Sequence, residues 1–363
     1  MKFWTLTALC GLGLAFQVWM VSQQGPALLR GTLEGHNDFL QLYVGARLAG
    51  TGELYSLEAN QRLQAELTGK VSPSIRYSRL PFYALLLRPL AALPYRAAYL
   101  TFQGLSLAAL LVFVWLTVPE CPLLAPLLCF SIPLTASFRQ GQDLMFLLLV
   151  LVVYQLLARR GHGFAAGLVL SLGLIKFHLL VLLWLGLVIR KHWPEVKGMV
   201  TGMGLALALS LAAGGPHWIA GYLALLRDPA LHPSPAIMPN LHGMTLGHTG
   251  IELGCAVVVV ALFGIIALRE PRRPMVEALA LIGSLLVSRH AYIQDSVLML
   301  AALAMLDKVD TSGPGKFLLL LFCTPLGALL QLTDPPVSVL PAAMLLLAYV
   351  MLVTAARPRP APA

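Results

Sequence analysis

Long apolar runs recur along the whole chain, and they constrain its fold more than any other feature. Runs such as LMFLLLVLVVYQLLA and AVVVVALFGIIAL contain no charged residue. The interior of a bilayer offers no water to backbone polar groups, so runs of this kind cross it as α-helices. Charged residues make up 11% of the 363 residues, whereas a soluble domain carries about 25%. The sequence therefore predicts an all-α polytopic membrane protein, with one integral membrane domain over residues 1–363.

The apolar runs predict about twelve membrane-spanning helices. The run in residues 1–21 lacks a small-residue cleavage site and is expected to stay as the first span rather than be removed as a signal. Residues 81–93 are apolar but are interrupted by Arg88 and Pro89, so this segment is expected to lie at the membrane interface. The other spans are expected at about 96–118, 122–138, 144–158, 164–175, 177–189, 198–214, 251–268, 275–287, 293–306, 316–331 and 337–356.

Two longer stretches, residues 22–80 and 215–249, are predicted to form long loops on the same side of the membrane. In the first loop the pattern predicts helices over about 38–49 and 57–68, the second of them behind Ser56 as its N-cap. Polar residues interrupt the apolar positions of both helices, as is typical of helices that lie on a membrane surface.

Basic residues predict the orientation of the chain. In the twelve-span topology they fall at helix ends on one side, which the positive-inside rule identifies as the cytoplasm. Both termini are then cytoplasmic, and both long loops face outward, as expected for a protein of the bacterial inner membrane. The basic residues that set this orientation are Lys2, Arg159, Arg160, Arg190, Lys191, Lys197, Arg269, Arg272, Arg273, Lys308, Lys316, Arg357 and Arg359.

Two other classes of function are not supported by the sequence. The formal charge of +9 comes from basic residues scattered at helix ends, so no basic face is available for nucleic acid. The five cysteines stand singly without a CxxC pair, which argues against both a disulfide framework and a zinc site. We expect no cofactor and predict no metal ligands, because the carboxylates lack ligand spacing. A requirement for a divalent metal is left open.

Polar residues on the predicted outer side gather into a few clusters. Each cluster taken alone fits a solvated helix end, but ionisable residues at membrane depth are candidates for a functional site. The candidate residues are His36, Asn37 and Asp38; Arg76, Tyr77 and Arg79; Arg139, Gln142 and Asp143; Lys176 and His178; Asn240 and His242; and Arg289, His290 and Asp295.

Together these clusters supply the groups needed for sugar transfer from a lipid phosphate. Asp38 is the predicted base, because a carboxylate can take the proton of an attacking hydroxyl. Lys176, Arg289 and Arg139 are candidate cations for the charge that builds on a leaving phosphate. Neutral donors nearby would bind a polyol.

Several motifs follow one another in an order that resembles a known family. Asp38-Phe39 opens a helix, GELY (residues 52–55) forms a turn, and Tyr77 precedes the segment that begins at Pro81. There follow GQ (residues 141–142), AGLVLSLGLIK ending at Lys176, and a late S-x-H with Asp295 five residues after the His. From Asp38 to Met299 the chain resembles the bacterial glycosyltransferase family 87, of the polyprenyl-phosphate-mannose-dependent α-mannosyltransferase type.

The resemblance implies a GT-C fold and an inverting transferase that works at the outer face of the membrane. Its donor would be a polyprenyl-phosphate hexose, with mannose expected, and its acceptor a glycolipid or a polysaccharide. Asp38 matches the aspartate taken as the general base, and Lys176 matches a candidate for the donor phosphate. Gln142, His290 and Asp295 match the Gly-Gln turn and the late His and Asp.

The chain departs from the family pattern at three positions. Arg79 and Arg289 each stand where the family often has proline, and Gln294 stands where it has tyrosine. The two extra cations could strengthen a phosphate site or indicate a different donor or acceptor.

Two rival functions stay open at the level of sequence. One is a transporter or flippase of lipid-linked sugars, which twelve spans would suit, although two similar halves are not recognisable. The other is a structural subunit whose polar clusters are solvated turns.

Overall fold

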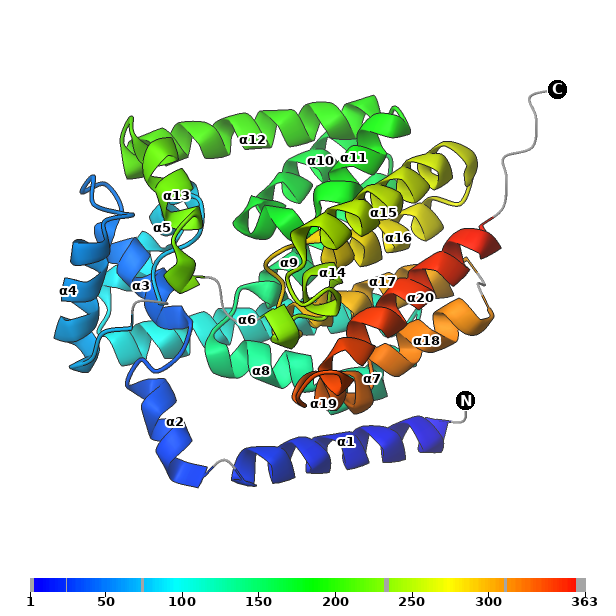
Figure 1. Ribbon diagram of the computed structural model, residues 1–363, viewed down its shortest axis with the longest axis horizontal. Coiled ribbons are helices and arrows are strands. Elements are labelled where there is room, and N and C mark those ends of the chain that lie inside the picture. Colours follow the sequence, from blue (N-terminus) through cyan, green and yellow to red (C-terminus); the bar gives the residue numbers. More distant parts are fainter. Residues whose placement is uncertain (1–2, 24, 73–74, 232–234, 310–311, 357–363) are drawn as a thin grey trace.

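The regular elements of the protein are helices throughout the part of the chain that the computed structural model describes (Figure 1). The all-helical prediction is therefore confirmed. Lys2, Arg357 and Arg359, three of the residues used to predict orientation, lie outside the described residues. The described ranges are 3–23, 25–72, 75–231, 235–309 and 312–356.

Among the described residues, five helices are long and apolar enough to cross a membrane. Two further candidates are helix pairs bent at a short break, by 117° and by 64°, so the number rises to seven if each pair is one span. Twelve spans are thus not confirmed. The five long candidates are α1 (Phe3–Gln23), α6 (Tyr95–Thr117), α12 (Trp193–Gly214), α15 (Thr249–Arg269), and η6 (Val337–Val339) with α20 (Leu340–Ala355).

Several expected spans are instead pairs of shorter helices. The span expected at 122–138 is divided into α7 (Leu124–Phe130) and α8 (Ile132–Gln140). The division has a local cause, because the Ser131 side chain accepts a hydrogen bond from the Leu134 amide at 3.2 Å and caps a new helix there. The span expected at 316–331 is similarly divided, with α18 (Pro314–Phe322) followed by α19 (Pro325–Gln331).

Most other predicted elements are present with small shifts of their ends. The segment expected at 293–306 begins with a short 3-10 turn, and the second long loop contains helices of its own. Residues 25–33 form a helix that the sequence did not predict. These elements are α2 (Gly25–Leu33), α9 (Leu144–Arg159), α10 (Gly163–Leu170), η2 (Ser171–Leu179), α11 (Val181–Ile189), α13 (Trp218–Leu226), η3 (Pro229–Leu231), η4 (Pro235–Ile237), α14 (Leu241–Met244), α16 (Arg273–Val287), η5 (Ile293–Val297) and α17 (Leu298–Asp307).

The first long loop folds as predicted into two helices, α3 (Phe39–Leu48) and α4 (Leu57–Thr68). The Ser56 cap is confirmed, since its hydroxyl accepts a hydrogen bond from the Ala59 amide at 3.3 Å. Residues 81–93 form α5 (Pro81–Leu87) and η1 (Arg88–Ala92), which pack against α3. These helical residues extend over about 20 Å, which is short of the roughly 30 Å of a bilayer core.

Two polar regions of the molecule lie at opposite ends of α9 and α16. At one end Arg273 contacts Glu195 at 2.7 Å and Glu277 at 2.7 Å, and Lys308 contacts Glu120 at 3.1 Å. The other ends of α9 and α16, about 22–24 Å away by helix length, carry the residues of the candidate site. The predicted cytoplasmic turns and the candidate site therefore lie at opposite ends of the same helices.

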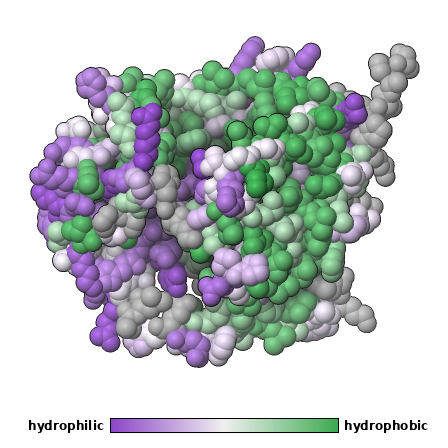
Figure 2. All heavy atoms as spheres, viewed as in Figure 1, coloured by the Kyte–Doolittle hydropathy of each residue, from purple (hydrophilic) through white to green (hydrophobic). Residues whose placement is uncertain are grey.

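The surface reflects this division. Figure 2 shows hydrophilic residues gathered over the end that carries α3 and α4, and they continue into the recess beside it. Apolar residues cover most of the rest of that face, with scattered hydrophilic residues among them. Exposed leucine, isoleucine and valine side chains on α6, α12 and α15 account for much of the apolar surface, as expected for helices that face lipid.

Candidate active site

Asp38 lies at the N-terminus of α3, but its carboxylate does not cap the helix. An aspartate in this position usually accepts a hydrogen bond from a backbone amide of the first turn. Here Asp38 Oδ2 instead accepts a hydrogen bond of 2.6 Å from Gln142 Nε2. Asp38 as a residue is partly exposed, and this hydrogen bond fixes its carboxylate through Oδ2.

Gly141 explains why Gln142 reaches Asp38. It ends α8 with a left-handed backbone (φ +65°), and a Cβ at this position would lie 2.6 Å from the Cβ of Phe39. Glycine is the residue that satisfies both conditions without strain. The turn between α8 and α9 therefore packs directly on the first residue of α3, and this contact joins the Asp38 and GQ motifs.

A network of buried charged side chains lies next to the turn between α8 and α9. Arg79 Nε donates to Asp143 Oδ2 at 3.0 Å, and the Lys176 ammonium lies 3.7 Å from Asp143 Oδ1. Lys176 also donates to Asp295 Oδ1 at 2.6 Å. The side chains of these four residues are between 0% and 11% exposed, so the pairs are largely shielded from water.

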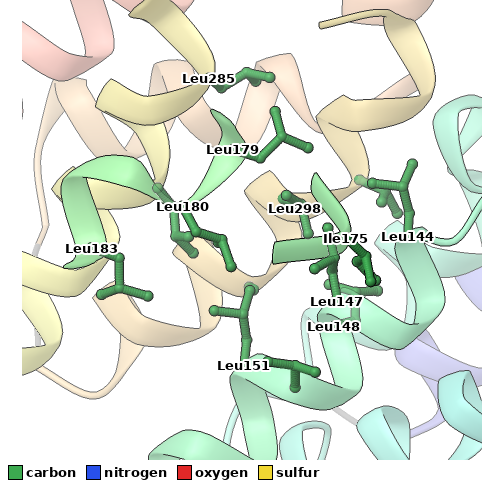
Figure 3. Packing of buried hydrophobic residues seen from close by; sticks show 14 of the residues in the cluster. Leu144, Leu147, Leu148, Leu151, Ile175, Leu179, Leu180, Leu183, Leu285 and Leu298 are labelled. Carbon is green, nitrogen blue, oxygen red and sulfur yellow. The ribbon is translucent and has the colours of Figure 1, made fainter. Parts of the chain in front are cut away.

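Lys176 is aimed at Asp295 by a break in the helical backbone. Within η2 its φ and ψ of −141° and 59° are not helical, as the sequence predicted for a turn between two short apolar segments. Ile175 and Leu179, on either side of it, are buried in the leucine core formed with α9, α16 and α17 (Figure 3). This core fixes the backbone from which the ammonium projects.

Two tyrosines of the first loop hold Arg79 in place. The Tyr55 hydroxyl donates to the Arg79 carbonyl at 2.7 Å, and the Tyr77 hydroxyl donates to the Leu80 carbonyl at 2.7 Å. Tyr77 is fully buried and packs on Gly45 of α3, where no side chain would fit. The GELY turn and the tyrosine before Pro81 thus have the same structural role, which is to position the segment that carries Arg79.

A second polar cluster, the Arg289–Glu252–His242 cluster, joins the loop after α16 to the start of α15. Arg289 Nε contacts Glu252 Oε1 at 3.1 Å, while His242 Nδ1 lies 2.8 Å from Glu252 Oε2. Asn240 is fully buried and donates to the Ser288 carbonyl at 2.6 Å. The second long loop is therefore fastened to the segment that leads from Arg289 to Asp295.

The remaining candidates lie around these two groups. Asn37 donates to the Thr32 carbonyl at 2.6 Å and accepts from the Tyr95 hydroxyl at 3.0 Å, which makes it part of the framework. Arg76 is buried and contacts Asp228 of the second long loop at 2.6 Å. The ring of His290 lies 4.9 Å from that of Tyr292, and the ring of His178 lies 5.7 Å from that of Phe177. His36 is exposed, and Arg139 is half-buried near the end of α8.

Opposing electrostatic effects act on Asp38. Burial raises the pKa of its carboxyl above the ordinary value. The hydrogen bond from Gln142 and the charges of Lys176 and Arg79 act in the opposite direction but do not cancel the effect of burial. The raised pKa brings the carboxyl closer to the range in which a general base works well.

The sequence did not predict the roles of two carboxylates, or that one oxygen of Gln142 would lack a hydrogen-bond partner. Glu252 and Asp228 lie in segments without a motif, and their roles as partners of Arg289 and Arg76 depend on long-range packing. The Oε1 atom of buried Gln142 has no hydrogen-bond partner among the described residues. In the same part of the chain, no group of three or more histidine, cysteine or acidic side chains is arranged to hold a metal ion.

Comparison with known proteins gives one match. Residues 80–289, more than half of the chain, match the family described as glycosyltransferase family 87. The chain belongs to glycosyltransferase family 87. No curated protein and no solved structure matches it. The family resemblance read from the sequence is thereby confirmed, and family 87 membership makes the protein a membrane glycosyltransferase.

The matched range covers only part of the site of this family 87 protein. Gln142, Asp143 and Lys176 lie within it. Asp38 precedes it and Asp295 follows it, so their roles rest on the geometry described above rather than on the family match.

Proposed function

We propose that the protein is an inverting hexosyltransferase that moves a sugar, with mannose the expected hexose, from a polyprenyl-phosphate donor to a lipid-linked or polysaccharide acceptor. The observation that carries this proposal is the Asp38–Gln142 pair. It presents a carboxylate that is fixed through Oδ2, on a partly exposed residue, next to a network of buried charges. A single base suffices for inversion, because a phosphate leaving group needs little protonation.

In this mechanism Asp38 takes the proton of the acceptor hydroxyl, and the hydroxyl oxygen attacks the anomeric carbon. The new glycosidic bond forms as the bond to the phosphate oxygen breaks, and the phosphate leaves with the electron pair.

The membrane arrangement belongs to the same proposal. We assign the chain to the GT-C fold in the bacterial inner membrane, with termini in the cytoplasm and the site on the outer side. Supporting this orientation, Arg273 and Lys308 lie at the opposite end of the helices from the site. The shorter helices, including α10 and α11 beside Lys176, would complete the crossings near the site.

Transfer by the purified protein tests this function. With radiolabelled polyprenyl-phosphate mannose and an extract of envelope glycolipids, we expect label in a glycosidic product with inverted anomeric configuration. If labelled lipid crossed proteoliposome membranes without forming any product, a flippase would replace the transferase.

The pH dependence of transfer should follow the ionisation of Asp38. Only the carboxylate acts as a base, so the rate should fall as the pH drops through a midpoint above the ordinary aspartate value of about 3.9. Replacing Gln142 with Met removes a hydrogen bond that lowers the pKa of Asp38, so this midpoint should move to higher pH. The rate profiles of Gln142→Met and wild type test this, with Gln140→Met, on the same turn, as the control. An unmoved midpoint in Gln142→Met would contradict the pairing.

A further inference from the structure

The donor phosphate needs a cation, but Lys176, the candidate from the sequence, is already paired with buried carboxylates. Lys176 is 4% exposed and its ammonium contacts both Asp295 and Asp143. Arg79 contacts Asp143 in the same way. Both cations are therefore ion-paired with carboxylates, and their side chains are only 5% and 11% exposed. The network offers a phosphate little access to either cation.

The geometry of inversion also separates the phosphate from the base. The acceptor oxygen and the leaving oxygen lie on opposite faces of the anomeric carbon. In inverting glycosidases the two catalytic groups accordingly stand about 6.5–9.5 Å apart. Lys176 and Arg79 both act electrostatically on Asp38, and both are already paired with buried carboxylates. A cation for the leaving phosphate is needed farther along the site.

Arg289 is the candidate for this cation. It is three residues from Tyr292, which an extended chain spans in about 11 Å at most, and the Tyr292 amide donates to Asp295 at 2.8 Å. Its side chain is 62% exposed, in contrast to the 5% of Lys176. Asn240 holds the adjacent Ser288 carbonyl, so the backbone that carries Arg289 is fixed.

Glu252 lies beside the Arg289 guanidinium. The contact at 3.1 Å joins Arg289 Nε to Glu252 Oε1, and a guanidinium also has donors on two terminal nitrogens that can bind two oxygens of one anion. Glu252 is only 8% exposed and uses its second oxygen for His242. The carboxylate therefore holds two nitrogen-bearing side chains side by side.

We propose that the Arg289–Glu252–His242 cluster is the anion site for the phosphate of the lipid-linked donor, with Arg289 as the direct ligand. Glu252 is then the positioning residue for Arg289 and His242, and Lys176 belongs to the buried framework that holds Asp143 and Asp295. This assignment rests on the proposed function. It also gives a role to an arginine that departs from the family pattern.

Binding of a short-chain polyprenyl phosphate to the full-length protein in detergent tests the assignment by isothermal titration calorimetry. We expect Arg289→Gln to weaken binding about 10- to 100-fold, as for loss of a charge-assisted bidentate contact. The uncharged polyprenol of the same chain length should bind wild type and variant equally. Glu252→Gln should weaken binding of the phosphate to a smaller extent, because the arginine stays but loses its orientation.

A matched control is available on the first long loop. Arg62 has a similarly exposed side chain, 59%, and pairs with Glu53 at 3.3 Å, so Arg62→Gln should bind the phosphate like wild type. If Arg289→Gln also bound it like wild type, or lost the polyprenol equally, the anion site would be wrong. Sugar transfer by wild type would then still support the proposed function. If wild type neither bound polyprenyl phosphate nor transferred sugar from it, both proposals would fail.

Discussion

Replacing Asp38 with Asn should lower the rate of sugar transfer by about 10²- to 10⁴-fold, the usual contribution of a general base. The substitution preserves shape, and the Asn carbonyl oxygen can still accept the hydrogen bond that Gln142 donates at 2.6 Å in the wild type. What it removes is the ability to take a proton. The rate constant for transfer from radiolabelled polyprenyl-phosphate mannose, measured at saturating donor, reports this loss.

The control for this experiment is Asp334→Asn, which changes an exposed aspartate in the turn before α20 and should leave the rate unchanged. Donor binding by Asp38→Asn should also be close to that of wild type, because the proposed phosphate ligand is Arg289. Full transfer by Asp38→Asn would rule out the base assignment. Loss of donor binding in this variant would instead assign Asp38 to the binding of substrate.

The features of the site that sequence could predict are those encoded by short local patterns. Gly141 ends α8 and packs on Phe39, and the backbone at Lys176 breaks the helix. Each of these features depends on the preference of one residue for one backbone conformation. Helix α4 of the first long loop depends in the same way on the cap at Ser56. Such local preferences can be recognised in a sequence because they do not depend on how the rest of the chain packs.

The partners of the charged residues could not be predicted in this way. Arg76 contacts Asp228, 152 residues later in the chain, and Arg289 contacts Glu252 across the start of α15. These pairings depend on how helices pack, which hydropathy does not encode. The same limit affected the spans, because hydropathy does not register a cap such as Ser131 that divides one apolar run into α7 and α8.

Replacing Lys176 with Met should destabilise the protein by about 3–5 kcal/mol, as expected when one partner of a buried ion pair is removed. The substitution leaves Asp295, whose side chain is 2% exposed, without the ammonium that now lies 2.6 Å away. Asp143 keeps its bond from Arg79, so the loss should arise mainly at Asp295. The free energy of unfolding in a mixed-micelle denaturant titration measures the effect.

The double variant Lys176→Met with Asp295→Asn separates this framework role from binding of phosphate. Removing both charges of a buried pair is often close to neutral, and the Asn carbonyl oxygen can still accept the hydrogen bond that the Tyr292 amide gives Asp295. Most of the lost stability should therefore return. Lys70→Met, at an exposed lysine of the first loop, provides the control. If Lys176→Met were as stable as wild type and lost only affinity for polyprenyl phosphate, Lys176 would be the phosphate ligand. A residue needed only for donor binding does not stabilise the fold, so the second substitution would then have no lost stability to restore.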